Sequence, residues 1–149
     1  MKFALDYDKL IFLDAEALAE GGIRKAYTSI LPRLKQYVTE PAEVREVADP
    51  SAPRYLVNCQ GVDYPIDSPE LPNDQGQSWG RAAHALFKII NDQLTRSEYR
   101  LFAINGGNDL GGMFLTQSEF EDARRSLPRP EDWPYVPTPE HPWYGQPHS

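Results

Sequence analysis

The stretch YRLFAINGGNDLGGMFLT, at residues 99–116, decides the fold. Its apolar ends, residues 99–104 and 113–116, predict two β-strands, and the glycine-rich residues 105–112 predict the loop that joins them. Glycines supply the positive φ angles that a long hairpin loop needs at several positions. A phosphate-binding loop would instead lead from a strand into a helix, and Asp109 would repel a phosphate. The stretch therefore predicts an antiparallel hairpin whose loop is either structural or a contact for a partner protein.

Two amphipathic helices precede this hairpin in the sequence, and a short helix follows it. Apolar residues recur at helical spacing over residues 23–38 and again over 79–94, which predicts two long helices. Pro32 falls opposite the first apolar stripe, so we expect a kinked helix rather than two separate ones. Ser118 and Glu121 form a capping-box pattern, which predicts the start of a short C-terminal helix.

Further strands are predicted at residues 43–47, 54–59 and 62–66, and Gln60-Gly61 is a plausible hairpin turn between the last two. Near the N-terminus, Asp14 is expected to cap a short helical turn. Short connections between strands favour antiparallel pairing. The sequence therefore predicts an α+β fold, with a mainly antiparallel sheet, two long amphipathic helices and one short C-terminal helix.

The C-terminal segment differs in composition from the rest of the chain. Half of the 14 prolines lie from Pro128 onward, together with Trp133 and Trp143. Disordered segments normally lack large aromatic side chains. We therefore expect one domain over residues 1–127 and a tail over residues 128–149 that packs either on this domain or on a partner.

The net charge excludes some classes of partner. The chain of 149 residues carries 22 acidic and 15 basic residues, a formal net charge of −7. A nucleic-acid-binding protein needs a basic surface to neutralise phosphates. No apolar run reaches the roughly 20 residues of a membrane-spanning helix, and the start lacks the pattern of a signal peptide. We therefore expect a cytoplasmic protein that binds neither nucleic acid nor membranes.

Residues that could carry catalysis are few. His84, His141 and His148 show no metal-ligand spacing, and Cys59 is a single cysteine at the end of a predicted strand. No nucleophile-elbow pattern occurs. We therefore assign no catalytic, cofactor-binding or metal-binding residue and expect no enzyme. A small hydrolase or nucleotide-binding enzyme built around Asp109 and His84 stays as an alternative.

Acidic residues form two groups that contain no lysine or arginine. Most such groups are solvated surface, but an acidic patch can also steer a basic protein into place. The first group contains Asp63, Asp67, Glu70 and Asp74, and the second contains Asp109, Glu119, Glu121 and Asp122.

Residues 99–116 also resemble the immunity proteins that accompany secreted polymorphic toxins of bacteria. The segments Gly76-Gln77-Ser78-Trp79-Gly80-Arg81 and Asp132-Trp133-Pro134-Tyr135 add to this resemblance, which covers residues 76–136. The resemblance implies a small cytoplasmic protein without activity of its own, which binds one cognate toxin and blocks it. No contact residue follows from the resemblance.

The sequence thus predicts an immunity protein that neutralises a toxin with a basic surface by stoichiometric binding, with acidic loops covering the toxin's active site. A non-toxin adaptor or chaperone that uses the same surfaces is the alternative binding function. The residues expected to contact the partner are Asp63, Asp67, Glu70, Asp74, Asn105, Asn108, Asp109, Trp133 and Trp143.

Overall fold

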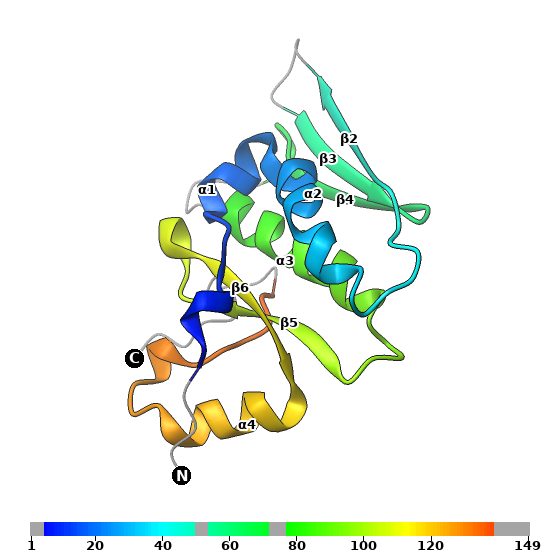
Figure 1. Ribbon diagram of the computed structural model, residues 1–149. Helices are drawn as coiled ribbons and strands as arrows, with labels where there is room; N and C mark the ends of the chain where they lie inside the picture. The colour runs from blue at the N-terminus through cyan, green and yellow to red at the C-terminus, as the bar shows by residue number, and fades with distance from the viewer. Residues whose placement is uncertain (1–4, 50–53, 72–76, 139–149) are drawn as a thin grey trace.

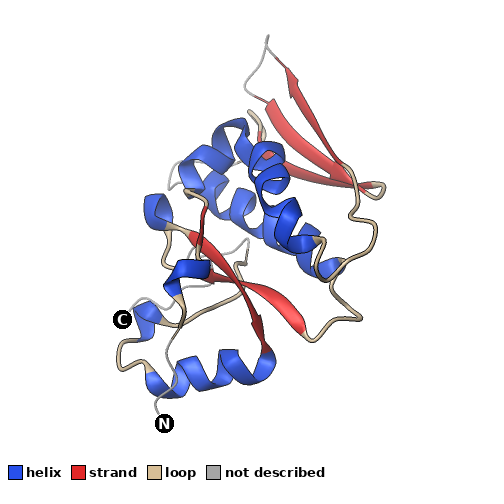
Figure 2. Cartoon of the chain, in the orientation of Figure 1, coloured by secondary structure: helices blue, strands red, loops and turns tan. Residues whose placement is uncertain are grey.

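Two antiparallel sheets enclose a pair of helices in the computed structural model, which describes residues 5–49, 54–71 and 77–138. Figures 1 and 2 show α2 and α3 between the two sheets, and α4 beyond the sheet that contains β5 and β6. The α+β prediction is confirmed, although the strands form two three-stranded sheets. The helices and strands are β1 (Ile11–Phe12), α1 (Ala15–Ala17), α2 (Ile23–Leu34), β2 (Val44–Asp49), β3 (Arg54–Cys59), β4 (Val62–Asp67), α3 (Gln77–Asp92), β5 (Tyr99–Ile104), β6 (Gly111–Thr116) and α4 (Gln117–Ser126).

The first sheet has the strand order β1-β6-β5, so the predicted hairpin of β5 and β6 is its main part. β6 begins at Gly111, two residues earlier than predicted. A Cβ atom on Gly111 would lie 2.7 Å from Leu10 Cδ1, so its glycine permits the close approach of the N-terminal segment. Within the loop, the positive φ angles fall on Asn105 (60°) and Gly107 (58°). Some of the glycines expected in the loop therefore belong to the strand.

The second sheet has the order β2-β3-β4 and is built from consecutive antiparallel strands. The predicted turn is confirmed at Gln60 and Gly61, whose φ angles are 52° and 80°. Tyr55, Val57 and Cys59 alternate along β3 and are buried. This side of the sheet therefore forms part of the hydrophobic core with α2 and α3.

The prediction of two long amphipathic helices is not confirmed. α2 spans 12 residues and ends at Leu34, whereas the apolar stripe suggested a helix to residue 38. The stripe extends further because Tyr37 and Val38, in the turn after the helix, also pack against the core. The kink lies before α2, at Glu20 and Gly21, and the φ angle of Gly21 is 96°. Pro32 lies in the last turn of α2 instead.

The capping box of α4 lies two residues earlier than predicted. The Thr116 hydroxyl accepts a hydrogen bond from the Glu119 backbone N–H at 3.1 Å, and the Glu119 carboxylate accepts one from the Thr116 N–H at 2.9 Å. Residues 116–119 and 118–121 both match the sequence pattern of a capping box. The end of β6 at Thr116 selects the first pair, so α4 follows the strand directly.

Candidate functional site

The first acidic group gains basic neighbours in the fold. The Glu70 carboxylate forms an ion pair with Arg54 at 2.6 Å. The pKa of Glu70 is lowered by hydrogen bonds from Ser68 and from the Glu70 backbone, and by the nearby charge of Arg54. Asp63, at the other end of β4, accepts a hydrogen bond from Asn58 Nδ2 at 2.7 Å.

Asp67 lies close enough to Arg81 to interact with it electrostatically. Asp74, the fourth predicted residue of this group, lies outside the described residues. The group is acidic in the sequence, but in the folded chain arginines from β3 and α3 lie beside it. It is therefore a weak candidate for binding a basic partner.

The predicted contact loop at residues 105–112 is held against the N-terminal part of the chain. Asn108 Nδ2 donates to Asp14 Oδ1 at 3.1 Å and to Glu16 Oε1 at 3.3 Å. The backbone N–H groups of Leu13 and Asp14 both donate to the Leu110 carbonyl oxygen. These bonds join two segments that are far apart in the sequence.

The loop and α1 together form what we call the acidic flank, defined by Asp14, Glu16 and Asp109. Asp109 belongs to the short 3₁₀ helix Gly107–Asp109, which packs against α1, and Asp14 caps α1 through the N–H groups of Glu16 and Ala17. Among the described residues, none of the ion pairs includes a carboxylate of the acidic flank. None of these three negative charges is therefore neutralised by an ion pair within the described residues, although Asp14 and Glu16 each accept a hydrogen bond from Asn108.

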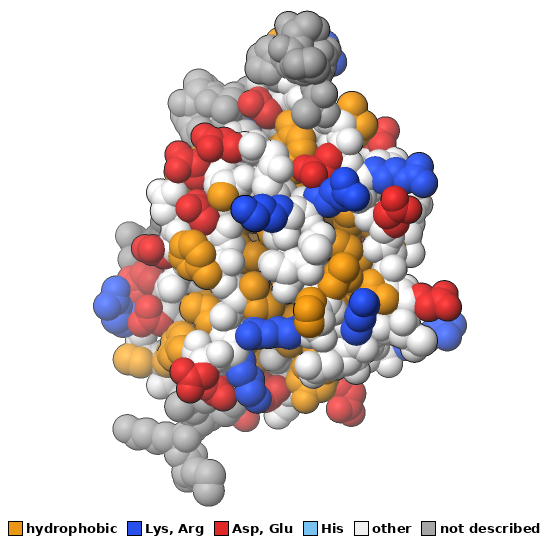
Figure 3. Space-filling view, turned by 45° about the horizontal axis from the view of Figure 1, so that its top comes forward, with side chains coloured by type: hydrophobic (Ala, Val, Ile, Leu, Met, Phe, Trp, Pro, Cys, Tyr) orange, Lys and Arg blue, Asp and Glu red, His pale blue; other side chains and the backbone are white. Residues whose placement is uncertain are grey.

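A large aromatic side chain is exposed next to the acidic flank. Phe12, two residues before Asp14, is 67% exposed, whereas its neighbour Ile11 packs against the core. Figure 3 shows acidic side chains gathered along the side of the molecule where α1 lies, with hydrophobic side chains beside them and basic ones across the middle of the view. An apolar contact bordered by charge is the usual composition of a protein–protein interface.

The remaining acidic residues of the second group lie on α4 and have local partners. Glu119 belongs to the capping box, Glu121 accepts a hydrogen bond from Gln117, and Asp122 pairs with Arg125. The fold thus separates Asp109 from the three acidic residues with which it was grouped in the sequence.

Asn105 and Trp133 are involved in contacts within the chain. The Asn105 carbonyl oxygen accepts a hydrogen bond from the Tyr135 hydroxyl, and Trp133 Nε1 donates to the Leu127 carbonyl oxygen at 2.9 Å. The Arg124 guanidinium lies 4.9 Å from the centre of the Trp133 ring. Trp143 lies outside the described residues. Trp133 therefore packs at the end of α4, where it remains partly exposed.

Sequence reasoning missed Phe12, Asp14 and Glu16 as surface residues of one site. Asp14 was interpreted only as a helix cap, a role that it has in the structure. No local pattern indicates that residues 14–16 and 107–109 meet, because their contact depends on the pairing of β1 with β6. Residues 10–13 are all apolar, so no sequence signal indicates that Phe12 is exposed.

The residues with catalytic potential lie in separate surroundings. His84 Nδ1 lies 3.4 Å from the Pro137 carbonyl oxygen, whereas Asp109 is exposed beside α1. Burial raises the pKa of the Cys59 thiol, and nearby Asp92 raises it further. Within the described ranges, no group of three or more histidine, cysteine or carboxylate side chains is arranged to hold a metal ion.

Across the described part of the chain, no helix has both the length and the apolar character needed to cross a membrane. Comparison with protein-family models, with curated proteins and with solved structures finds no match. Proposals about function therefore rest on the residues and their geometry.

Proposed function

We propose that the chain is a binding protein of the immunity type, which neutralises a bacterial toxin by covering a basic surface of that toxin. The observation that carries the proposal is the acidic flank beside the exposed Phe12. Asp14 and Glu16 come from α1 and Asp109 comes from the loop before β6, so the fold itself assembles the surface.

Charge gives this surface its selectivity for a basic partner. Opposite charges on two proteins accelerate their encounter, and this acceleration weakens as salt screens the charges. The net charge of −7 adds a long-range attraction to the local one. The cleft of a toxin that acts on nucleic acids or nucleotides is basic because it binds phosphates, so it is the surface that three clustered carboxylates would match best.

Phe12 supplies the apolar contact that charge alone does not provide. Its side chain is 67% exposed on the two-residue edge strand β1. Aromatic side chains at the centre of an interface commonly contribute a large share of the binding energy. We therefore assign Phe12 to the centre of the interface and the acidic flank to its rim.

Co-expression with a toxin tests the proposal. An immunity gene is expected beside its toxin gene, so the toxin domain encoded next to this chain is the one to use. The expected result is a one-to-one complex by size-exclusion chromatography and survival of cells that express both proteins. If neither a complex nor protection is found, the proposal is wrong.

A charge-neutral variant then tests the acidic flank. The variant D14N/E16Q/D109N removes three charges, and asparagine at position 14 can still cap α1. We expect its association rate at low salt to fall by about tenfold or more. The matched control E40Q/E98Q/E121Q removes three exposed charges elsewhere and should change the rate little. Equal losses in the two variants would show that only net charge matters.

Phe12→Ser tests the apolar contact separately. Loss of a central aromatic side chain should weaken the complex by about tenfold or more, mainly through faster dissociation. The exposed Val62, at 50% exposure on the second sheet, offers the control Val62→Ser. If both substitutions have the same small effect, Phe12 does not lie in the interface.

A further inference from the structure

A cleft of about 300 Å³ lies along β6, between the end of α2 and the start of α4, and its lining includes residues from both faces of the first sheet. Its lining comes from four parts of the chain: the N-terminal segment, the end of α2, strands β5 and β6, and the start of α4. Neither the acidic flank nor Phe12 belongs to this lining. The cleft is therefore a feature that the proposed function does not use.

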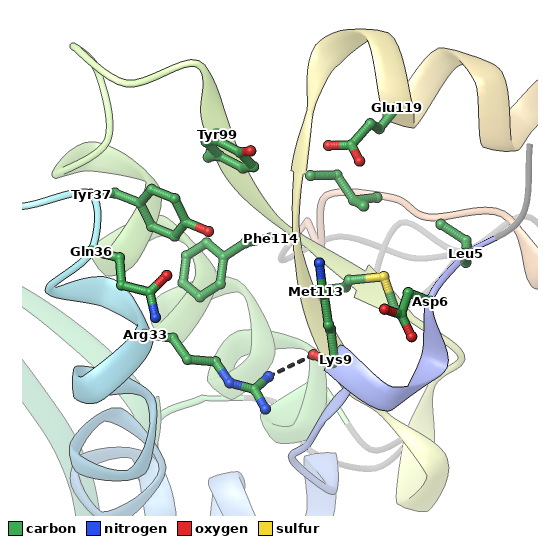
Figure 4. A pocket seen from close by; sticks show the side chains of 11 residues that line it. Leu5, Asp6, Lys9, Arg33, Gln36, Tyr37, Tyr99, Met113, Phe114 and Glu119 are labelled. Atoms are coloured by element: carbon green, nitrogen blue, oxygen red, sulfur yellow. Dashed lines mark hydrogen bonds between the residues drawn. The ribbon is translucent and has the colours of Figure 1, made fainter.

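One wall of the cleft is aromatic. The Tyr37 and Tyr99 rings are stacked with centroids 4.5 Å apart, and the Phe114 ring lies 5.1 Å from Tyr37. Figure 4 shows Tyr37, Tyr99 and Phe114 on one side of the cleft, and Lys9 and Glu119 on the other. Such a wall offers a planar ring both apolar contact and favourable ring–ring packing.

The cations of the cleft are available, whereas its carboxylates are already engaged. Arg33 Nη1 donates to the Lys9 carbonyl oxygen at 2.6 Å, which leaves the other N–H groups of this guanidinium for a ligand. Among the described residues, neither Lys9 nor Arg33 forms an ion pair. Glu119 serves the capping box of α4, and Asp6 caps a 3₁₀ turn through the Asp8 N–H.

We propose that this cleft binds a small aromatic carboxylic acid. The ring lies against Tyr37 and Phe114, and the carboxylate binds the Arg33 guanidinium, whose fork of N–H donors matches two carboxylate oxygens. The Lys9 side chain adds a second positive charge to the lining of the cleft, from the side opposite the aromatic wall. The volume is at the lower end of that of ligand pockets, so it suits a molecule of one or two rings.

Isothermal titration with indole-3-acetate and tryptamine tests the proposal. The two probes share the indole ring, but one carries an anion and the other a cation. The expected result is binding of indole-3-acetate at least about tenfold tighter than that of tryptamine. Equal affinities for the two probes, or no binding of indole-3-acetate at millimolar concentration, would overturn the proposal.

Substitutions locate the binding on the protein. Arg33→Gln should weaken indole-3-acetate binding by about tenfold, whereas Arg24→Gln, an exposed arginine of the same helix, should leave it unchanged. Tyr37→Leu should weaken both probes, because it removes the shared ring contact. Thermal unfolding of each variant verifies that the fold is intact, and Lys9→Gln, at an exposed position, provides a second test of the charge. Binding that survives both charge substitutions would refute the assignment.

Discussion

Asn91 links α3 to the open side of β5 by two hydrogen bonds. Its side-chain Nδ2 donates to the Leu101 carbonyl oxygen at 3.0 Å, and its Oδ1 accepts from the Leu101 N–H at 2.7 Å. One amide side chain thus takes the place of a neighbouring strand at this position. A buried backbone group that loses its partner costs about 1–3 kcal/mol.

We therefore predict that Asn91→Ala lowers the free energy of unfolding by about 2–3 kcal/mol. The control is Asp92→Ala, which removes only an exposed ion pair with Lys88; such pairs contribute about 0–1 kcal/mol. Chemical denaturation measures both. A loss at Asn91 no larger than at Asp92 would mean that water replaces the amide without cost.

Tyr55 connects β3 with α2 and with β2 through its hydroxyl. The hydroxyl accepts a hydrogen bond from the Ile23 N–H at 3.1 Å and donates one to the Glu46 carboxylate. Burial raises the pKa of Tyr55 strongly, and the bond to Glu46 raises it further. The folded protein therefore holds this proton more tightly than the unfolded chain does.

From this we predict a loss of stability at alkaline pH. Since the pKa is raised on folding, the contribution of Tyr55 is complete below about pH 10, the ordinary pKa of tyrosine, and is lost as the pH rises further. Tyr55→Phe should be less stable at pH 7 by about 1 kcal/mol. Urea denaturation should show that the difference in free energy of unfolding between this variant and the natural chain becomes smaller above pH 10. A difference that stays constant across that range would contradict the role given to the Tyr55 hydroxyl.

At the scale of elements, local sequence patterns predicted the hairpins and the helical turn that local interactions form. The β5–β6 and β3–β4 hairpins followed from turn residues and apolar runs, and the helical turn capped by Asp14 followed from its capping residue. Pairing between distant segments could not be predicted in this way. The division into two sheets, the place of β1 beside β6 and the acidic flank all depend on such pairing.

The start of α4 gives an element-scale prediction, since two overlapping sequence patterns compete there. Thr116→Ala should lower the free energy of unfolding by about 1 kcal/mol because it removes the hydroxyl that caps the helix. Ser118→Ala, within the exposed first turn, should change the free energy of unfolding by a few tenths of a kcal/mol at most. Thermal or chemical denaturation of the two variants compares these losses directly. A larger loss for Ser118→Ala than for Thr116→Ala would place the cap at Ser118.

At the scale of the whole molecule, the segment after α4 completes the first sheet. The Ala103 N–H donates to the Tyr135 carbonyl oxygen at 2.6 Å, and the Tyr135 N–H donates to the Ala103 carbonyl oxygen at 3.0 Å. Tyr135 is 6% exposed and belongs to the main hydrophobic core. The described part of the predicted tail therefore contributes to the domain on which it lies.

Truncation after Leu127 should consequently destabilise the domain and open the edge of β5. Exposed strand edges pair with other chains, so we predict a lower melting temperature together with self-association by size-exclusion chromatography. Tyr135→Phe, which keeps the backbone pairing and loses the hydroxyl bond to Asn105, should remain monomeric. A truncated chain that is as stable and as monomeric as the full chain would make the tail a separate unit.

The pairing of Ile11 with Gly112 also constrains the order in which the chain can fold during synthesis. The sheet of β2, β3 and β4 uses consecutive strands, so it can form while the ribosome is still translating the remainder. The other sheet cannot form before β6 has been synthesised, and the outer edge of β5 gains its partner only when Tyr135 has been synthesised. The apolar residues around β1 thus remain without their partner until most of the protein has been made, which is the interval in which a nascent chain most needs a chaperone.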